Sequence, residues 1–371
     1  MSETAPDADY MRQALELARG GLGRTSPNPA VGALVVRDGE VIGRGFHTWA
    51  GVKHAEVLAL EEAGERARGA TLYVTLEPCV HQGRTGPCTE AILAAGIRRA
   101  VVAVEDPNPA VQGAGLRRLR EAGIEVELAE SFRAEAERLN EAFFHFMRKG
   151  RPLVTLKAAL TLDGKITTGL ANDRWITGEQ ARAHVQQLRH LSDAVLTGIG
   201  TVLADDCLLT DRTGQERSRP LLRIVLDSQL RIPLESRMVT SARGDLLVVT
   251  TSAAPREKRQ ELEARGAEVV TFDGPEGRTD WQALLAWLAE RRYLSLMLEA
   301  GGRVSGSALE AGIVDKIFFY YAPKIAARPE ALPLAAFSSG GAQRDTIKLR
   351  DLVLHRITPA EFAVEAWIAR G

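Results

Sequence analysis

The stretches His54-Ala55-Glu56 and Thr75-Leu76-Glu77-Pro78-Cys79, followed after eight residues by Cys88, decide how the first part of the chain is organised. One imidazole and two thiolates can hold a zinc ion and leave its fourth tetrahedral position open, as catalytic zinc sites do. A carboxylate two residues beyond the histidine can carry protons for a reacting water. The sequence therefore predicts a catalytic zinc site that uses the histidine and both cysteines.

The order H-x-E followed by P-C-x-x-C is the signature of zinc-dependent nucleobase deaminases. This chain matches it in residue types and order, although eight residues, not two, separate its cysteines. Taken singly, each residue has an ordinary alternative: a core histidine, a surface carboxylate or a buried thiol. Their combination favours hydrolytic deamination, with His54, Cys79 and Cys88 as metal ligands and Glu56 as the catalytic proton carrier.

The composition indicates a two-domain protein with small-molecule partners. The chain has 371 residues, which suits two domains of about 150 to 220 residues. Its 47 basic and 48 acidic side chains nearly cancel, so it lacks the basic surface that nucleic acid or an anionic membrane would require.

The cysteine content and the first residues indicate a reducing, cytoplasmic location. Only three cysteines are present, and two of them are assigned to the metal, so a disulfide framework is implausible and Cys207 is expected to be structural or incidental. The chain starts with an acidic segment without an apolar core, and no apolar run is long enough to span a bilayer.

Hydrophobic periodicity predicts alternating helices and strands in the first 150 residues. In order, we predict a helix from residue 9 that ends at Gly20-Gly21, a hairpin of strands 31–37 and 40–46 joined at Asp38-Gly39, a helix over 54–66, a strand over 71–76, a helix over 88–95, a strand over 99–104, a helix over 115–122, a strand over 124–128 and a helix to about residue 148. Both His54 and Glu56 are then expected in the first turn of a helix, whose positive pole would help to keep Glu56 ionised. The ligands would meet in the crevice at the strand ends.

A basic segment that ends in proline, residues 147–152, marks the predicted domain boundary. Beyond it we predict strand 153–160, helix 179–190, strands 193–197, 221–226 and 246–250, helix 255–265, strand 268–272, helix 281–292, strand 294–298, and mainly strands from residue 314. Residues 299–306 form a glycine-rich strand-to-helix turn that could hold a phosphate. Their spacing is not G-x-G-x-x-G, so a Rossmann domain is poorly supported.

Both halves of the chain resemble the bifunctional deaminase/reductase family of riboflavin biosynthesis. The first half matches it at residues 27–32, 75–79, 81, 83–85, 87–88 and 106–109, and the second at residues 157, 162–165, 175–177, 200–206, 227–228 and 299–302. Val80, Gln82, Gly86 and Cys207 depart from the family pattern.

The resemblance implies an α/β fold with two domains. Residues 1–150 would form a cytidine-deaminase-like zinc domain, and residues 151–371 a dihydrofolate-reductase-like, NADPH-dependent reductase domain. The first would hydrolyse the 2-amino group of 2,5-diamino-6-(5-phosphoribosylamino)pyrimidin-4(3H)-one, and the second would reduce the ribosyl group of the product to ribityl. The expected cofactors are Zn²⁺ and NADPH. The expected partners are this phosphoribosylated pyrimidine and further copies of the chain in a homo-oligomer, without nucleic acid or membrane.

The resemblance also assigns binding residues by motif. The cofactor contacts would be Ala159, Trp175, Thr201, Asp205, Ser228, Gly301, Gly302, Arg303, Val304, Ser305, Gly306 and Ser307. The substrate contacts would be Asn28, His47, His81, Arg84, Asp106 and Asn108 in the first domain and Asp173, Arg189, Leu209, Arg212 and Glu299 in the second. Singly, Trp175 could be core packing and the two arginines solvated charges, but arginine suits a sugar phosphate because its fork binds phosphate bidentately.

Two other functions remain open at this stage. One is a deaminase of free or tRNA-borne bases with an unrelated second domain, which the long cysteine loop disfavours and, for tRNA, the near-zero net charge also disfavours. The other is a zinc-stabilised interaction module. Structural zinc takes four protein ligands, and only three are apparent here unless His47 or His81 joins them.

Overall fold

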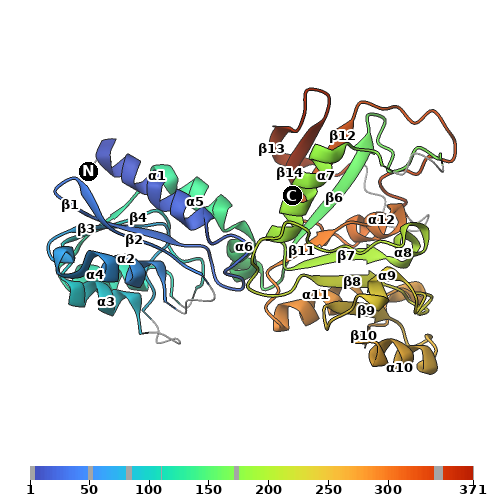
Figure 1. Ribbon diagram of the computed structural model, residues 1–371, viewed down its shortest axis with the longest axis horizontal. Helices are drawn as coiled ribbons and strands as arrows, with labels where there is room; N and C mark the ends of the chain where they lie inside the picture. The colour runs from blue at the N-terminus through green and yellow to red at the C-terminus, as the bar shows by residue number, and fades with distance from the viewer. Residues whose placement is uncertain are drawn as a thin grey trace. The chain divides into compact units, whose positions relative to one another are not determined.

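The computed structural model describes residues 5–48, 53–80, 86–109, 111–170, 175–337 and 346–370. The chain divides into two compact units (Figure 1), one made of Met1–Gly150 with Glu216–Arg219 and the other of Arg151–Gln215 with Pro220–Gly371. The short segment Glu216–Arg219 thus groups with the first unit, although the sequence suggests a single boundary. Within the described ranges, no helix is both long enough and apolar enough to cross a membrane.

The described strands of the first unit form one sheet in the order β2-β1-β3-β4-β5. They are β1 (Gly32–Arg37), β2 (Glu40–Phe46), β3 (Thr71–Val74), β4 (Arg99–Val102) and β5 (Glu125–Leu128). The predicted hairpin is confirmed, because β1 and β2 pair antiparallel and Arg37 faces Glu40. Asp38 and Gly39 both have positive φ, 51° and 82°, which is the turn geometry that matches the twist of a two-residue hairpin. The last three strands, β3, β4 and β5, run parallel.

The helices of the first unit carry or support the predicted site. They are α1 (Ala5–Arg19), α2 (Ala55–Ala63), α3 (Cys88–Ala95), α4 (Ala114–Glu121), α5 (Arg133–Leu139) and α6 (Glu141–Lys149), with 3₁₀ turns at Gly64–Ala67 and Glu130–Phe132. The predicted helix bounds of 88–95 are confirmed by α3. The predicted strands 71–76 and 99–104 are too long by two residues each, because the chain leaves the sheet there to form the loops of the site.

The last predicted helix of this unit is wrong as a single element. It is interrupted at Asn140, whose φ and ψ of −112° and 29° are not helical. The buried Asn140 side chain accepts a hydrogen bond from Ala30 N and donates one to Ala30 O, both at 2.8 Å. This pairing with a distant backbone segment explains why α5 ends and α6 begins there.

The described strands of the second unit form a sheet in the order β10-β9-β8-β7-β11-β6-β12-β14-β13. They are β6 (Leu153–Thr161), β7 (Ala194–Gly198), β8 (Leu222–Leu226), β9 (Leu246–Thr250), β10 (Ala267–Thr271), β11 (Ser295–Leu298), β12 (Lys316–Ala322), β13 (Leu349–Arg356) and β14 (Phe362–Ile368). Every neighbouring pair from β10 to β12 is parallel, and β14 and β13 add an antiparallel edge. Parallel strands direct their carboxyl ends to one edge, where α/β proteins bind ligands.

Helices cover both faces of this second sheet. They are α7 (Glu179–Leu191), α8 (Ile199–Asp205), α9 (Arg237–Thr240), α10 (Arg256–Ala264), α11 (Trp281–Glu290) and α12 (Gly302–Glu310), with a 3₁₀ turn at Pro275–Gly277. One core packs α11 and α12 against the sheet, and a second packs α8, α9 and α10 against the opposite face. The alternating pattern of the sequence predicted α7, α10 and α11, and the glycine-rich turn at 299–306 predicted the start of α12. It missed α8 and the four-residue α9, which are too short for a helical period to appear.

Candidate metal centre and cofactor site

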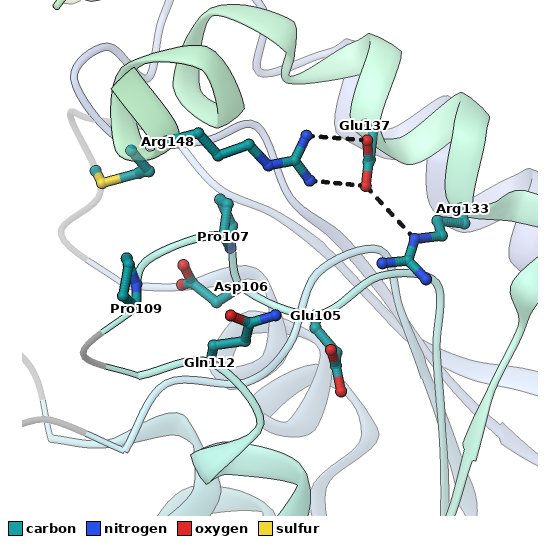
Figure 2. A pocket seen from close by; sticks show the side chains of 9 residues that line it. Glu105, Asp106, Pro107, Pro109, Gln112, Arg133, Glu137 and Arg148 are labelled. Atoms are coloured by element: carbon teal, nitrogen blue, oxygen red, sulfur yellow. Dashed lines mark hydrogen bonds and ion pairs between the residues drawn. The ribbon is translucent and has the colours of Figure 1, made fainter. Parts of the chain in front are cut away.

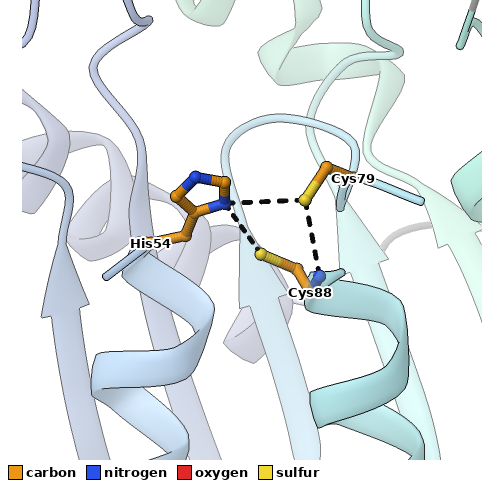
Figure 3. Close-up of side chains that lie close together, drawn as sticks. All are labelled: His54, Cys79 and Cys88. Atoms are coloured by element: carbon orange, nitrogen blue, oxygen red, sulfur yellow. Dashed lines mark hydrogen bonds between the residues drawn. The ribbon is translucent and has the colours of Figure 1, made fainter. Parts of the chain in front are cut away.

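The three predicted metal ligands lie together in the first unit (Figure 3). His54 Nδ1 is 3.0 Å from Cys88 Sγ and 3.5 Å from Cys79 Sγ, and all three ligand atoms lie within 4.8 Å of one another. Ligand atoms around a tetrahedral zinc ion at 2.0 to 2.3 Å would be roughly 3.5 to 3.8 Å apart. One nitrogen and two sulfurs at this spacing fit zinc, so these residues would hold it.

Each ligand is placed by the end of a regular element. The sequence predicted His54 in the first turn of the helix. It is instead the N-cap of α2, with an extended ψ of 160°. Cys88 begins α3, and Cys79 follows β3 in a loop where Thr89 donates from both its backbone N and its Oγ1 to Cys79 O, each at 3.2 Å. The N-termini of α2 and α3 therefore both lie beside the loop that carries Cys79. The positive ends of the two helix dipoles then favour thiolates at this site.

Helix α2 reaches this position because it packs unusually close to strand β2. A Cβ added to Gly43 would lie 2.0 Å from Ala59 O, and one added to Gly45 would lie 2.1 Å from Ala55 O. Only glycine lets the helix backbone come so near the strand. The glycines of β2 thus allow α2 to lie close enough to the strand for His54 and Glu56 to approach the cysteines.

The site favours a thiolate on Cys79 and a protonatable Glu56. Hydrogen bonding from the Cys88 side chain outweighs burial and, together with the nearby His54 ring, lowers the pKa of Cys79 to about 4. Glu56 is only 4% exposed, and burial raises its pKa to about 6. The backbone hydrogen bond at the helix start does lower the pKa of Glu56, as expected, but burial raises it by more, so the net shift is upward. A carboxyl group with a pKa near neutrality can both accept and return a proton.

Two predicted substrate residues, Asn28 and His47, form a pair near the metal ligands. The Asn28 amide Nδ2 lies 3.1 Å from His47 Nε2, and His47 Nδ1 lies 3.1 Å from Lys53 O. The His47 ring meets that of His54 edge-on at 5.2 Å. Burial lowers the pKa of His47, so a neutral ring that donates from Nδ1 fits these contacts.

Asp106 and Asn108 lie on the loop between β4 and α4, where Asp106 Oδ1 accepts from Asn108 N at 2.8 Å. Asp106 lines a cavity of about 270 Å³ (Figure 2). Helices α5 and α6 form its other wall, where Arg133 and Arg148 both pair with Glu137. The predicted contacts His81 and Arg84 lie outside the described residues.

The metal assignment predicts which cysteines matter for zinc. We expect about one zinc ion per chain in the purified protein and only a small fraction of that in Cys79→Ser or Cys88→Ser protein, since each change removes a thiolate ligand. Cys207→Ser is the control: burial raises the pKa of Cys207 to about 11, so its thiol is not a ready ligand. Elemental analysis checks this, and full zinc occupancy in both ligand variants would contradict the assignment.

In the second unit, a largely buried cluster of three charged residues lies at the end of strand β11. Glu299 Oε1 and Oε2 accept from Arg189 Nε and Nη2 at 2.5 and 3.0 Å, and Oε2 also accepts from Lys157 Nζ at 3.1 Å. Burial opposes the charge on Glu299, but the two cations outweigh it and lower its pKa to about 2. The sequence assigned Arg189 and Glu299 to substrate, while Lys157 entered only as part of a family motif. Lys157 lies on β6 at the level of the end of β11, and this pairing of two strands far apart in the sequence brings it to Glu299.

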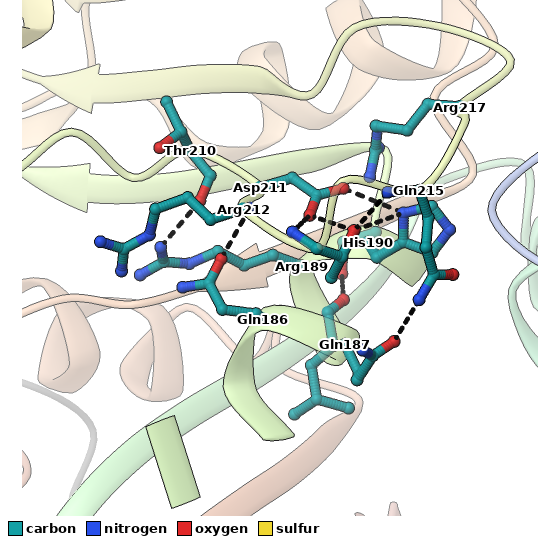
Figure 4. Close-up of polar contacts among 12 residues, drawn as sticks. Gln186, Gln187, Arg189, His190, Thr210, Asp211, Arg212, Gln215 and Arg217 are labelled. Atoms are coloured by element: carbon teal, nitrogen blue, oxygen red, sulfur yellow. Dashed lines mark hydrogen bonds and ion pairs between the residues drawn. The ribbon is translucent and has the colours of Figure 1, made fainter. Parts of the chain in front are cut away.

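The segment after α8 runs alongside helix α7 (Figure 4). Arg189 donates from Nη1 to Thr210 O at 3.0 Å, and Arg212 N donates to Gln186 Oε1 at 2.9 Å. The Arg212 side chain is exposed. Leu209, in contrast, is buried in the core with a φ of 52°, so its side chain packs inside the protein.

Four of the twelve predicted cofactor residues lie at or just beyond the carboxyl ends of neighbouring parallel strands. Thr201 follows β7, Ser228 follows β8, Gly301 follows β11, and Ala159 lies near the end of β6. Among the described residues, the atom nearest to a Cβ added to Gly301 would be Thr201 Oγ1, at 3.8 Å, whereas a Cβ added to the next residue, Gly302, would lie 2.8 Å from Pro333 O. The N-cap Gly301 therefore has room beside it and no side-chain cap, which fits a phosphate group of a dinucleotide.

Other predicted cofactor residues are placed differently. Ser305 and Gly306 are buried, and Ser307 Oγ accepts from Trp281 Nε1 at 3.0 Å, so these three face the protein interior. Arg303 and Asp205 are exposed, and Val304 is half-buried. Trp175 is 55% exposed with the Arg182 guanidinium 5.0 Å from its ring centre, so it is not core packing. Asp173 lies outside the described residues.

Family models match both units of the chain. The model described as the cytidine and deoxycytidylate deaminase zinc-binding region matches residues 4–104, and the RibD C-terminal domain matches residues 152–356. With the ligand cluster of the first unit, these matches define a two-domain α/β enzyme. It joins a cytidine-deaminase-like domain of the zinc-binding type to a dihydrofolate-reductase-like reductase domain.

Relatives match nearly the whole chain. The riboflavin biosynthesis protein RibD of Actinobacillus pleuropneumoniae is 43% identical over 89% of this chain and 87% of its own length. The structure of Acinetobacter baumannii RibD, form 1, has a TM-score of 0.85 at 37% identity and covers 98% of this chain and 99% of that one. A diaminohydroxyphosphoribosylaminopyrimidine deaminase/5-amino-6-(5-phosphoribosylamino)uracil reductase from Thermotoga maritima has a TM-score of 0.82 at 35% identity, with 97% and 98% covered. The chain belongs to the RibD family of bifunctional deaminase/reductases of riboflavin biosynthesis, which confirms the predicted family and fold class.

Proposed function

We propose that the first domain deaminates 2,5-diamino-6-(5-phosphoribosylamino)pyrimidin-4(3H)-one and that the second reduces the ribosyl group of the product to ribityl. The observation that carries the proposal is the cluster of His54, Cys79 and Cys88 beside the buried Glu56, in a chain that RibD relatives match nearly end to end. In the first reaction water adds to ring C2, the bond from C2 to the exocyclic nitrogen breaks, and ammonia leaves.

For the deamination, His54, Cys79 and Cys88 would hold a zinc ion. When bound, zinc supplies Lewis acidity that makes a water molecule nucleophilic near neutral pH. Glu56 takes a proton from the attacking water and returns it to the leaving amino group, which its raised pKa supports. The neutral His47 and its neighbour Asn28 orient the pyrimidine, and Asp106 and Asn108 contact the rest of the substrate from the loop after β4.

For the reduction, the carboxyl edge of the second sheet binds NADPH, which supplies a hydride when bound. Gly301 and the start of α12 would hold its phosphates, and Ser228 and Thr201 would contact other parts of the dinucleotide. In the overall reaction, C1 of the ribosyl group gains a hydride, the bond from C1 to the ring oxygen breaks, and that oxygen gains a proton. Glu299 accepts hydrogen bonds from sugar hydroxyls, and Lys157 beside it is a cationic proton donor.

One assay tests the proposal against its alternatives. The full chain, loaded with zinc, is expected to release ammonia from the diaminopyrimidine without NADPH and to oxidise NADPH only when the deaminated compound is present. Ammonia release from cytidine or from tRNA, but not from the diaminopyrimidine, would instead assign another deaminase substrate. Zinc binding without any ammonia release would favour the interaction module.

The reductase domain is expected to prefer NADPH over NADH by roughly tenfold or more, because a 2′-phosphate adds charge-assisted hydrogen bonds. Ser228, after β8, is the hydroxyl that we place near this phosphate. Titration of both cofactors into the full chain, followed by nicotinamide fluorescence, measures the ratio. Ser228→Ala should lower the ratio of NADPH affinity to NADH affinity. Equal affinity for the two cofactors in the wild-type protein would contradict the prediction.

We also propose a cytoplasmic location and a homo-oligomer that binds only small molecules. All three cysteines are free, which suits a reducing compartment. Sedimentation of the purified chain measures the oligomeric state.

A further inference from the structure

Glu77, directly before Pro78-Cys79, is a buried carboxylate that belongs to neither the ligand set nor the predicted substrate contacts. It is 5% exposed. Its Oε2 accepts from Asp106 N at 3.0 Å and from Gly113 N at 2.9 Å. Its Oε1 accepts from Gly115 N at 2.7 Å and from Leu116 N at 3.4 Å. One side chain therefore receives four backbone amides from a single segment.

The segment that Glu77 binds is the loop between β4 and α4. Glu77 accepts hydrogen bonds from both ends of the loop, at Asp106 and at Gly113, and so ties the two ends together. The loop carries Asp106 and Asn108, and its residues line the cavity of the first unit (Figure 2). The Glu77 backbone also joins the same region, since Glu77 N donates to Val104 O at 2.9 Å.

A carboxylate suits this position better than any neutral side chain. Gly113 is the N-cap of α4 and has no side-chain cap, so the amides of Gly113, Gly115 and Leu116 are among those that a helix start leaves unsatisfied. They also carry the positive end of the helix dipole. All four amides are donors, so both atoms at the end of the side chain must be acceptors. Glutamine would turn one of them into a donor that faces two N–H groups.

We propose that Glu77 is a positioning residue for deamination: it fixes the loop that carries Asp106 and Asn108 against the substrate, while Cys79, two residues later, binds the metal. This inference rests on the proposed deaminase function. The tripeptide Glu77-Pro78-Cys79 would then serve both parts of the site, because Glu77 holds the loop that contacts the substrate and Cys79 binds the metal.

The test compares Glu77→Gln with wild-type full-length protein. The variant is expected to keep its zinc and its reductase activity, because Cys79 and the second unit are unchanged. Loss of the loop contacts should raise the KM for the diaminopyrimidine and lower kcat/KM by about 10- to 100-fold, with kcat changed much less. The backbone amides that donate to Glu77, those of Asp106, Gly113, Gly115 and Leu116, should exchange hydrogen faster than in the wild type.

Glu90→Gln is the matched control. Glu90 lies on α3 and pairs with Arg118 of α4 at 2.9 Å, but both side chains are about half exposed, 53% and 45%. This variant loses a carboxylate in the same region and should keep its KM, because exposed ion pairs contribute little.

Each other result would overturn the inference. Unchanged KM and exchange in Glu77→Gln would mean that the loop does not need the carboxylate. Loss of zinc, or failure to fold, would assign Glu77 to the metal site or to the core. If wild-type protein released no ammonia from the diaminopyrimidine, the proposed function would fail. The exchange measurement needs no substrate, so it would still test whether Glu77 holds the loop between β4 and α4.

Discussion

Glu56→Gln protein is expected to release ammonia from the diaminopyrimidine roughly a thousandfold more slowly than the wild type, since general acid and base catalysis typically contributes 10² to 10⁴ in rate. Glutamine keeps the shape and volume of glutamate, so the buried position in the first turn of α2 remains filled. It cannot take a proton from water or return one to the leaving amine, and both transfers are assigned to this group. Zinc content should stay the same, because Glu56 is not a ligand.

The same variant separates the two activities. With deaminated substrate and NADPH, Glu56→Gln protein should oxidise NADPH at close to the wild-type rate, because Lys157, Arg189 and Glu299 belong to the other compact unit. Stopped-flow absorbance of NADPH and an ammonia assay on the same preparation measure both. Persistent ammonia release would remove Glu56 from the proton-transfer role, and a parallel loss of NADPH oxidation would refute the division of labour.

Glu299→Gln is expected to damage the second unit in two ways. It leaves Lys157 and Arg189 close together and without their shared anion, and breaking a buried ion pair typically costs about 3 to 5 kcal/mol of unfolding free energy. Reduction should also fall by on the order of 100-fold, since a charged group that we propose contacts the substrate is lost. Urea unfolding followed by tryptophan fluorescence reports the stability, because four of the five tryptophans lie beyond residue 150.

The cost of Glu299→Gln should depend on pH. The pKa of Glu299 is about 2 in the folded protein, against an ordinary 4.5, so the native state favours its ionised form by about 3 kcal/mol. This contribution is fully present above pH 4.5 and is lost as pH falls toward 2. The stability difference between wild type and variant should therefore shrink in acid. Glu268→Gln, whose carboxylate is exposed and 4.0 Å from Arg291, should show no such difference, and a pH-independent gap for Glu299→Gln would count against the ion-pair explanation.

The sequence predicted the architecture well where local signals were strong. Asp38-Gly39 indicated the hairpin, the residues 246–250 of β9 were predicted with the right bounds, and Cys88 was expected to open a helix. The alternating strands and helices predicted after residue 150 likewise match most of the elements found there in type and order. In each case the local pattern and the tertiary structure favour the same conformation.

The missed features depend on contacts between distant residues. The break at Asn140 exists because its side chain binds Ala30, 110 residues away. The burial that raises the pKa of Glu56 follows from the close packing of α2 on the glycines of β2, which motif spacing does not reveal. Lys157 and Glu299 are 142 residues apart, so only the pairing of β6 with β11 brings them together.

Each unit has a sheet of its own, and no described strand of one sheet pairs with the other. The two catalysts could therefore have been encoded by separate genes, yet here one reading frame encodes both. Every completed polypeptide then delivers one deaminase and one reductase, whatever the level of transcription. A cell that carries this gene cannot balance the two steps by changing the ratio of the two enzymes, so an excess of unreduced intermediate would not signal a shortage of the second enzyme.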